Sequence, residues 1–584
     1  MEEKSAVLIG VRWKEWGDEA FDLAAKLDKP ILLAIGATWC HWCHVMDHTS
    51  YADAAIIDII NREFIPVRVD TDRRPDVNER YNLGGWPTTA FLTPRGDLLT
   101  GGTYIPPGQM GRLARQVADA YRNHKTEIYS EILRTGKAKA AAPAGPAELP
   151  PLVEAAPVVQ EALIQGILRG ADPVFGGFGT APKFPNFPAL RACLSYYYFT
   201  REERFKDVLV RTLDGMGNGG TYDPVEGGFF RYSTTEDWKI PHFEKMSEDL
   251  AQFIPIYLDA AVLLGVEAYK EKALDVTRYV LNTQYDRETG AFYGSQDADE
   301  EYYALPLEER KKRAAPAVDS TFYVNWNARM ASAFFRATQV TGSAEYLEVA
   351  LRALNYLRTR CESEAEGLCH YYDGAGRHFG WLDDQVCAAH AALDAYETTG
   401  EPSWLEWAQH LAAIITRLED SAGGGFHDIP KPATAPGYLK EPKKPLQDNA
   451  EAARLFLRLH GLTEKAEYRT TAERTLSAFL ATFAEWGIFA GDYALAVDAF
   501  VRGPLEAHLV GSLTDGVAGD LQRAVLREFH PFRVVRYSKP EKGTGTAGTE
   551  PVPSSPALYL CAHGKCLAPI RNASVIPSSL LSLA

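Results

Sequence analysis

Cys40 and Cys43, two cysteines with two residues between them, are the side chains in this sequence best suited to chemistry. They come directly after the apolar run 30–36 and open a segment with the spacing of a helix. The first turn of a helix presents free N–H groups and a partial positive charge, both of which favour a thiolate. Because the thiolate is the species that attacks a disulfide, we expect Cys40 to be the nucleophile and Cys43 the resolving thiol.

The dipeptide Trp86-Pro87, just before the apolar run 88–92, is the second part of this pattern. A cis bond costs little only before proline, and a cis-proline at this place packs against the dithiol in thioredoxin folds. We expect Trp39, Trp86 and Pro87 to surround the cysteines and contact a bound substrate. Strands alternate with helices throughout this region, which predicts an α/β sheet of the thioredoxin-like kind.

Three other interpretations of the cysteine pair stay open. The stretch from Cys40 to His44 matches the C-x-x-C-H pattern of c-type haem attachment, although no export signal is visible. The two cysteines and a histidine can hold a metal ion, and the pair can also be retained without activity. We favour the redox interpretation and expect neither a metal nor another cofactor.

Polar and aromatic residues are densest between residues 221 and 249. Here His242 and Glu244 are candidates for a general base and its acid or orienting partner. Farther along, Asp297 and Asp299 form a carboxylate pair suited to acid–base work on a glycosidic bond. The expected ligand contacts are Arg231, Tyr232, Trp238, Trp326, Asp383 and His427. Capping of a helix alone would also account for Asp383.

The elements that must position these residues are helices, which follow one another from 157 to 503. Loops containing glycine and aromatic residues recur between alternate helices, at Gly176, Gly227, Gly290, Gly367, Gly423 and Gly487. Repetition at this scale predicts stacked helical hairpins. Six hairpins closing on themselves would form an (α/α)6 barrel and gather the loops at one end, whereas an open helical array is the alternative.

The whole chain, with 584 residues, is too long for one hydrophobic core. We expect a thioredoxin-like domain at 1–135, an Ala/Pro-rich linker at 136–156, an all-α barrel at 157–503 and a small α/β appendage at 504–584. The net charge of −16 argues against nucleic acid and anionic membranes as partners. No membrane span or signal peptide is visible, which indicates a cytoplasmic protein.

A second cysteine pair, Cys561 and Cys566, lies near the end of the chain. A disulfide, a metal pair completed by His563, and two ordinary thiols are all compatible with its spacing.

Motifs along nearly the whole chain resemble the spermatogenesis-associated, thioredoxin-domain protein family. They include GATWCHWCHVM, GGWPTTAFL, GGFFRYSTTEDWKIPHFEKM, WLDDQVCAAHAAL and YLCAHGKCLAPI. The resemblance implies a thioredoxin-like domain fused to a six-hairpin toroid similar to those of N-acylglucosamine 2-epimerases and glycoside hydrolases. One departure is Ser247-Glu248-Asp249, where the family has Leu-Tyr-Asp.

These observations predict an enzyme, a thiol–disulfide oxidoreductase fused to a carbohydrate-active-like toroid. Its expected partners are a protein disulfide or a thioredoxin-like dithiol, and a sugar-like small molecule. Two alternatives remain: a non-catalytic protein that senses redox state and binds a ligand, and a sugar hydrolase or epimerase that uses the loop face of the barrel.

Overall fold

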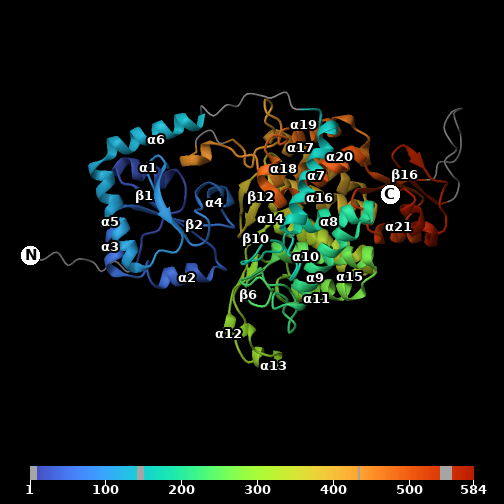
Figure 1. Cartoon of the computed structure of the whole chain (residues 1–584), viewed down its shortest axis with the longest axis horizontal. Helices are drawn as coiled ribbons and strands as arrows, with labels where there is room; N and C mark the ends of the chain where they lie inside the picture. The colour runs from blue at the N-terminus through green and yellow to red at the C-terminus, as the bar shows by residue number, and fades with distance from the viewer. Residues whose placement is uncertain (1–9, 141–149, 432–434, 540–555, 584) are drawn as a thin grey trace, which may run out of the picture. The chain divides into compact units, whose positions relative to one another are not determined.

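The computed structural model describes residues 10–140, 150–431, 435–539 and 556–583 (Figure 1). The chain forms two compact units. Unit 1 contains residues 1–148 together with 429–443, and unit 2 contains residues 149–428 and 444–584.

Unit 1 is built on a four-stranded sheet with the order β2-β1-β3-β4. Its strands are β1 (Ile31–Gly36), β2 (Ile65–Asp70), β3 (Thr88–Leu92) and β4 (Leu98–Gly102). The first two pair in parallel, and β3 runs antiparallel to both β1 and β4. Its helices are α1 (Asp18–Leu27), α2 (His41–His48), α3 (Ala54–Glu63), α4 (Pro75–Tyr81), α5 (Pro107–Asn123) and α6 (Lys125–Ala140). This mixed sheet with its helices confirms the predicted thioredoxin-like fold. The middle strands β1 and β3 are buried on both faces.

A segment from the helical region of the sequence, Ile429–Lys443, belongs to unit 1. The ring of Tyr438 stacks on Tyr81 with centroids 5.0 Å apart and planes at 11°. The Tyr438 amide donates to the Tyr81 hydroxyl at 2.8 Å, and Arg80 donates to the Tyr438 carbonyl at 3.1 Å. Gly96 lies so close to Gly437 that a Cβ on Gly96 would be 2.3 Å from the Cα of Gly437. Unit 1 is therefore completed by chain from far along the sequence.

Unit 2 contains a closed ring of six inner helices, each packed against the next and the last against the first. The inner helices are α8 (Phe187–Thr200), α10 (Ser247–Leu264), α14 (Val324–Thr341), α16 (Leu382–Thr399), α18 (Leu446–Thr463) and α20 (Gly491–Arg502). An outer helix backs each of them: α9 (Glu203–Asn218), α11 (Glu267–Thr283), α15 (Ala344–Tyr356), α17 (Pro402–Ile415), α19 (Ala466–Ser477) and α7 (Leu152–Gly170). The inner helices are buried on most of their surface, with alanines and large apolar residues facing their neighbours and polar residues also enclosed. The six-hairpin toroid is confirmed, and α7 completes it by pairing with α20 from the other end of the helical region.

Four of the glycine loops share one turn. In the first, the Gly176 amide donates to the Asp172 carbonyl at 3.1 Å, and the Asp172 amide donates to the Gly177 carbonyl at 2.9 Å. The same two bonds recur in the loops that begin at Asp223, Asp286 and Asp420. The glycine that takes the place of Gly176 has φ between +68° and +83° in all four loops, a conformation in which a side chain would be strained.

A lysine holds three of these turns closed, an arrangement that we call the lysine clip. Its ammonium donates to the aspartate carboxylate and to the carbonyl of the turn's glycine. Lys245 makes these bonds to Asp223 at 2.7 Å and to Gly227 at 2.8 Å. Lys183 and Lys444 do the same in the turns that begin at Asp172 and Asp420. Since Lys183 and Lys245 are completely buried, the clips fix the loops between hairpins from within.

Short strands and helices lie between the hairpins and carry side chains towards the inner helices. They are β5 (Tyr232–Ser233), β6 (Pro241–His242), β7 (Lys245–Met246), β8 (Ser295–Gln296), α12 (Glu300–Tyr303), α13 (Leu307–Arg310), β9 (Val318–Asp319), β10 (Phe322–Tyr323), β11 (Glu362–Ser363), β12 (Gly367–Tyr372) and β13 (Gly376–Phe379). Strand β5 pairs with β6, β8 lies between β7 and β9, and β12 pairs with β10, β11 and β13.

The C-terminal part of unit 2 is a small α/β region with its own core. Its sheet has the order β15-β14-β16-β17. Its elements are β14 (Leu505–Val510), α21 (Gly516–Arg527), β15 (Arg533–Ser538), β16 (Ala557–Ala562), β17 (Lys565–Cys566) and α22 (Ile576–Leu581). Cys561 and Cys566 face each other across β16 and β17 and form a disulfide, the first of the three interpretations left open.

None of the helices in the described residues is long and apolar enough to cross a membrane.

Candidate functional site

The cysteine pair lies where β1 gives way to α2. Cys40 and Cys43 form a disulfide. Cys40 is the N-cap residue of α2, and its Sγ accepts a hydrogen bond from the Cys43 amide at 3.2 Å. Both side chains are buried, whereas the neighbouring Trp42 is half exposed. A thiolate formed on Cys40 would therefore meet a helix N-terminus and a backbone donor already aimed at it.

Two tryptophans and a proline were expected beside this disulfide, and the structure gives the contacts of the tryptophans. The Trp86–Pro87 bond is cis. Trp39 and Trp86 meet edge to face with centroids 5.6 Å apart. The Trp39 indole N–H donates to Asp72 at 2.6 Å, and that of Trp86 donates to Asn78 at 3.1 Å. Both rings are thus held by hydrogen bonds, and Trp39, which directly precedes Cys40, links Trp86 to the start of α2.

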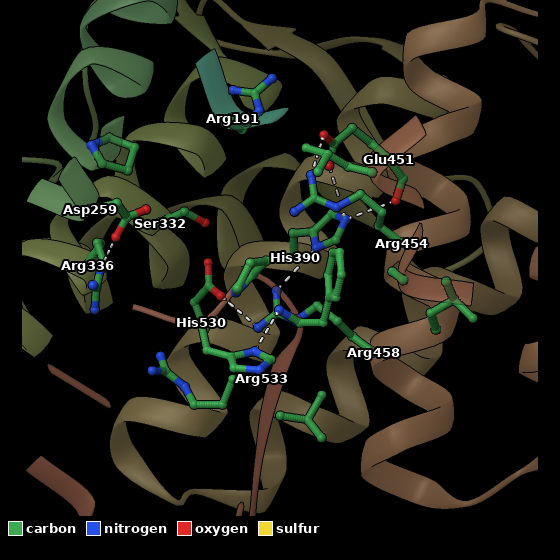
Figure 2. Close-up of a pocket in the computed structure, with 18 of the residues that line it drawn as sticks. Arg191, Asp259, Ser332, Arg336, His390, Glu451, Arg454, Arg458, His530 and Arg533 are labelled. Carbon is green, nitrogen blue, oxygen red and sulfur yellow. Dashed lines mark hydrogen bonds and ion pairs between the residues drawn. The ribbon is translucent and has the colours of Figure 1, made fainter. Parts of the chain in front are cut away.

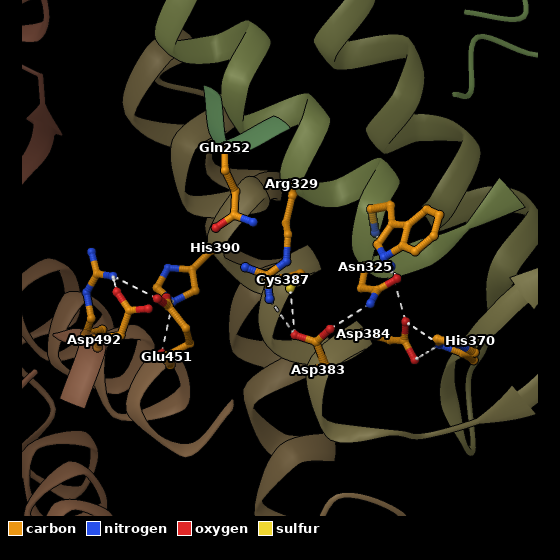
Figure 3. Close-up of polar contacts among 12 residues, drawn as sticks. Gln252, Asn325, Arg329, His370, Asp383, Asp384, Cys387, His390, Glu451 and Asp492 are labelled. Atoms are coloured by element: carbon orange, nitrogen blue, oxygen red, sulfur yellow. Dashed lines mark hydrogen bonds and ion pairs between the residues drawn. The ribbon is translucent and has the colours of Figure 1, made fainter. Parts of the chain in front are cut away.

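In unit 2, charged residues from the first turns of the inner helices meet at the toroid axis, and Asp383 on α16 is one centre of this group (Figure 3). Arg329 and Asn325, both on α14, donate to its two oxygens at 2.7 Å each. The Cys387 thiol donates to it at 3.1 Å. Burial works to raise the pKa of Asp383, but Arg329 outweighs it and holds that pKa below its usual value. Asp383 is therefore an ionised carboxylate at neutral pH.

Asp384, the next residue, points to a different partner (Figure 3). It lies 3.0 Å from Nδ1 of His370 on β12 and accepts a hydrogen bond from the main-chain N–H of Asn325 at 3.2 Å. Burial raises its pKa. The two adjacent carboxyl groups thus have opposite electrostatic environments.

A second charged group lies across the axis, on α8, α16, α18 and α20. Arg191 forms a two-pronged ion pair with Asp492 at 2.9 and 2.7 Å. His390 donates from Nε2 to the Glu451 carbonyl at 3.0 Å and accepts at Nδ1 from Arg458 at 3.2 Å. Burial lowers the pKa of His390 to about 4, so this ring is a neutral tautomer with its proton on Nε2.

The predicted residues from the loop before α10 form a group that we call the rim. Nδ1 of His242 lies 3.1 Å from Glu244, and Arg231 lies 3.7 Å from the same carboxylate. The Tyr232 ring stacks on His242, with centroids 5.0 Å apart, and on Phe184 at 4.4 Å. The structure therefore brings four of the predicted site residues into direct contact.

Two acidic residues at the start of α10 lie between the rim and the Asp383 group. Burial raises the pKa of Asp249 to about 7, against the opposing charge of Arg231. Burial also raises the pKa of Glu248, which feels the charges of both Arg329 and Asp383. No group of three or more His, Cys, Asp or Glu side chains arranged to hold a metal ion occurs among the described residues.

Comparison with known proteins agrees with this two-part organisation. Residues 4–138 match the family described as "Protein of unknown function, DUF255", and residues 273–483 match glycosyl hydrolase family 76. Spermatogenesis-associated protein 20 of Rattus norvegicus is 28% identical, over 82% of this chain and 77% of its own length. The predicted resemblance to the spermatogenesis-associated, thioredoxin-domain family is confirmed.

Two sugar epimerases are also similar to parts of the chain. Cellobiose 2-epimerase of Bacteroides fragilis is 31% identical over 23% of this chain and 30% of its own. The solved structure of cellobiose 2-epimerase from Spirochaeta thermophila covers 61% of this chain and 99% of its own, with a TM-score of 0.49 and 16% identity.

The other predicted site residues lie elsewhere in the toroid. Asp299 caps α12 by accepting the Tyr302 amide at 2.8 Å, and Asp297 accepts the Ala298 amide at 2.8 Å. Neither is bonded to Asp383, whose partners are Asn325, Arg329 and Cys387.

Two predicted aromatic contacts and one histidine are largely enclosed. Trp238 is fully buried and donates to the Phe175 carbonyl at 3.0 Å, which is a structural role. Trp326 packs 4.4 Å from Tyr323, and Nδ1 of His427 is buried without a hydrogen-bond partner among the described residues.

Several central residues were not predicted from the sequence. They are Arg191, Asp249, Arg329, His390, Glu451 and Asp492. All lie in the first three turns of an inner helix, on segments that are otherwise rich in Ala and Leu. Charged residues at positions of these helices that the apolar pattern predicts to be buried would have been the signal, since a buried charge needs a partner.

The substitution Asp249→Asn is expected to stabilise the protein above neutral pH. The unfolded carboxyl ionises near pH ~3.9, whereas the folded one keeps its proton up to a pKa of about 7. The stability that the protonated Asp249 provides is therefore present below about pH 4 and is lost as the pH rises, by at most about 1.4 kcal/mol per pH unit. The variant's melting temperature should exceed that of the wild type at about pH 8 and equal it near about pH 4. A constant difference across this range would contradict the assignment.

Proposed function

We propose that this chain is a thiol–disulfide oxidoreductase that acts through Cys40 and Cys43. One observation carries the proposal: the two cysteines are joined in a disulfide at the N-terminus of α2, with the Cys43 amide already bonded to Cys40 Sγ. The same donor and the helix N-terminus would stabilise negative charge on Cys40 once the disulfide is reduced.

In the proposed reaction, the Cys40 thiolate attacks one sulfur of a substrate disulfide. A mixed disulfide forms, and the other substrate sulfur leaves as a thiolate. Cys43, deprotonated, then attacks Cys40 Sγ and releases the second substrate thiolate, which restores the Cys40–Cys43 disulfide. A dithiol donor reduces that disulfide for the next cycle by the same two exchanges.

Reduction of insulin disulfides by the full chain, with dithiothreitol as donor, tests this proposal. The full chain is needed because Ile429–Lys443 is part of unit 1. Cys40→Ser should reduce the rate to that of dithiothreitol alone, whereas Cys193→Ala, which removes a buried thiol on α8, should leave it unchanged. Equal rates for wild type and Cys40→Ser would reject the proposal and favour the non-catalytic, redox-sensing alternative.

We also propose that the loop face of the toroid acts on a sugar-like molecule. Carboxyl groups whose pKa values are displaced in opposite directions can serve as acid and base in one reaction. Asp249, with its pKa raised to about 7, can donate a proton near neutral pH, and the ionised Asp383 can accept one. Arg231, Tyr232 and His242 supply hydrogen bonds and a ring face to a hydroxylated ligand. We place both activities in the cytoplasm.

Turnover of cellobiose and of mannosides by the wild type, Asp249→Asn and Asp383→Asn tests the second proposal. Both variants should lose about a hundredfold or more of any activity, the usual contribution of a positioned acid or base. Asp299→Asn is the matched control, because asparagine keeps the cap of α12. Activity lost only in Asp299→Asn would move the site to the Asp297–Asp299 pair.

A further inference from the structure

A cavity of about 370 Å³ lies on the axis of the toroid, among the inner helices (Figure 2). Its far end is formed by residues 528–534, the segment that leads into β15. Asp249 and Asp383 are not among the residues that line it. None of the rim residues lines it either, although Arg329 and Cys387, which donate to Asp383, do, so the cavity begins behind the Asp383 group. It has the volume of a small-molecule site.

The wall of this cavity is rich in cationic side chains. Seven arginines and five carboxylate side chains line it among the described residues. Two carboxylates that pair with these arginines, Asp383 and Asp492, lie behind the wall rather than in it. Burial lowers the pKa of His390 to about 4 and that of His530 to about 3, so neither ring adds or removes charge at neutral pH.

Arg533 is a lining arginine whose positive charge has no carboxylate in contact with it among the described residues. Its guanidinium donates to two main-chain carbonyls, those of Val525 at 2.7 Å and Glu528 at 2.6 Å. Its Nε is buried without a hydrogen-bond partner, and no carboxylate of the described residues lies within 4.0 Å of it. Burial and the nearby charges of Arg336 and Arg458 lower its pKa to about 10, against the opposing charges of Glu397 and Asp259. Its positive charge is thus only partly neutralised by its neighbours.

Two further donors in the wall lack partners. Nε of Arg329 and the hydroxyl of Ser195 are buried and make no hydrogen bond to any described residue. Each buried donor left unpaired costs about 1–3 kcal/mol, so a ligand that brings acceptors into the cavity would gain that much per donor satisfied. The wall therefore favours a ligand rich in acceptor oxygens and negatively charged.

We propose that the axial cavity binds a small organic anion, a carboxylate or a phosphate ester, whose charged oxygens accept hydrogen bonds from Arg533. The site lies beyond the rim, and its existence depends neither on the dithiol nor on the chemistry proposed for Asp249 and Asp383. Charge-assisted bonds to arginine are the strongest kind available for such a group.

Thermal unfolding and calorimetric titration of the full chain test the site with four probes. These are inorganic phosphate, glucose 6-phosphate, glucuronate and uncharged glucose, at an ionic strength matched with sodium chloride. At least one anionic probe should raise the melting temperature more than glucose or chloride does. Stabilisation by glucose 6-phosphate but not glucuronate identifies a phosphate ester, and the reverse identifies a carboxylate. Equal effects of all four probes and of chloride would reject the proposal.

Three variants locate the effect. Arg533→Met should weaken binding of the active probe by at least about tenfold. Ser332→Leu narrows the cavity without removing a charge and should also weaken binding of the active probe. It provides the test if Arg533→Met fails to fold. Arg523→Met, which removes an exposed arginine from α21, is the matched control and should bind normally. Unchanged binding in Ser332→Leu would place the anion elsewhere and overturn the assignment.

Discussion

The variant Cys43→Ser should accumulate as a mixed disulfide between Cys40 and its substrate. Release of the substrate requires a second thiolate held within the same active site, and serine cannot supply one. Without this intramolecular attack, release should slow by on the order of a hundredfold or more, because it then depends on thiols from solution. Non-reducing electrophoresis and mass spectrometry of the full chain, incubated with a disulfide-containing protein, would detect the adduct.

The surroundings of the two sulfurs predict which cysteine forms the mixed disulfide with the substrate. Cys40 and Cys43 are buried to a similar degree, so exposure alone does not distinguish them. What differs is that Cys40 is the N-cap and receives the backbone hydrogen bond. Cys40→Ser, and the variant that combines Cys40→Ser with Cys43→Ser, should therefore form no adduct. An adduct in Cys40→Ser but not in Cys43→Ser would show that the two roles are reversed.

The thioredoxin-like fold was predictable because its two middle strands are buried on both faces and therefore contain no charged side chain. Residues 30–36 and 88–92 stand out for this reason, and the structure places β1 and β3 there. The toroid was predictable because each hairpin ends in a turn that requires glycine at a positive φ, as at Gly176 and Gly227. Local chemistry thus marks both folds in the sequence.

Contacts between distant parts of the sequence left no such mark. The pairing of α7 with α20 joins the two ends of the helical region, and Ile429–Lys443 completes unit 1. In the second case the contact is a matter of shape: Tyr438 lies flat on Tyr81, and Gly437 leaves room for Gly96. Neither tyrosine nor glycine in a loop is unusual enough to predict its partner.

The candidate site was predicted only in part, for a similar reason. The rim residues His242 and Glu244 were recognisable because they are crowded into one loop. Arg329 and Asp383, in contrast, are 54 residues apart and meet only when α14 and α16 pack together. Asp297 and Asp299 resembled an acid–base pair by spacing alone, whereas the structure shows Asp299 capping a helix.

Removal of the Asp223 carboxylate should be among the most destabilising single changes in unit 2. Asp223 is almost completely buried and accepts hydrogen bonds from both Lys245 and Arg310, at 2.7 Å each. Burial works to raise the pKa of Asp223, but Lys245 and Arg310 hold it below its usual value, so the group is charged. Asp223→Ala would leave the buried Lys245 without a carboxylate and Arg310 with Glu226 alone, and the loss of one partner of a buried ion pair costs about 3–5 kcal/mol. Thermal or urea unfolding would measure the change.

Asp286→Ala provides a matched control, because the same turn occurs there without a lysine clip. The Asp286 carboxylate accepts from the Thr289 hydroxyl at 2.7 Å, and its loss leaves an uncharged donor rather than a buried cation. Its cost should stay near the ~1 kcal/mol of an ordinary hydrogen bond. Lys245→Met should fall between the two, since Arg310 still neutralises Asp223. If Asp223→Ala and Asp286→Ala were equally destabilising, the turn itself rather than the buried charge would hold the loops, and the clip at Lys245 would contribute little.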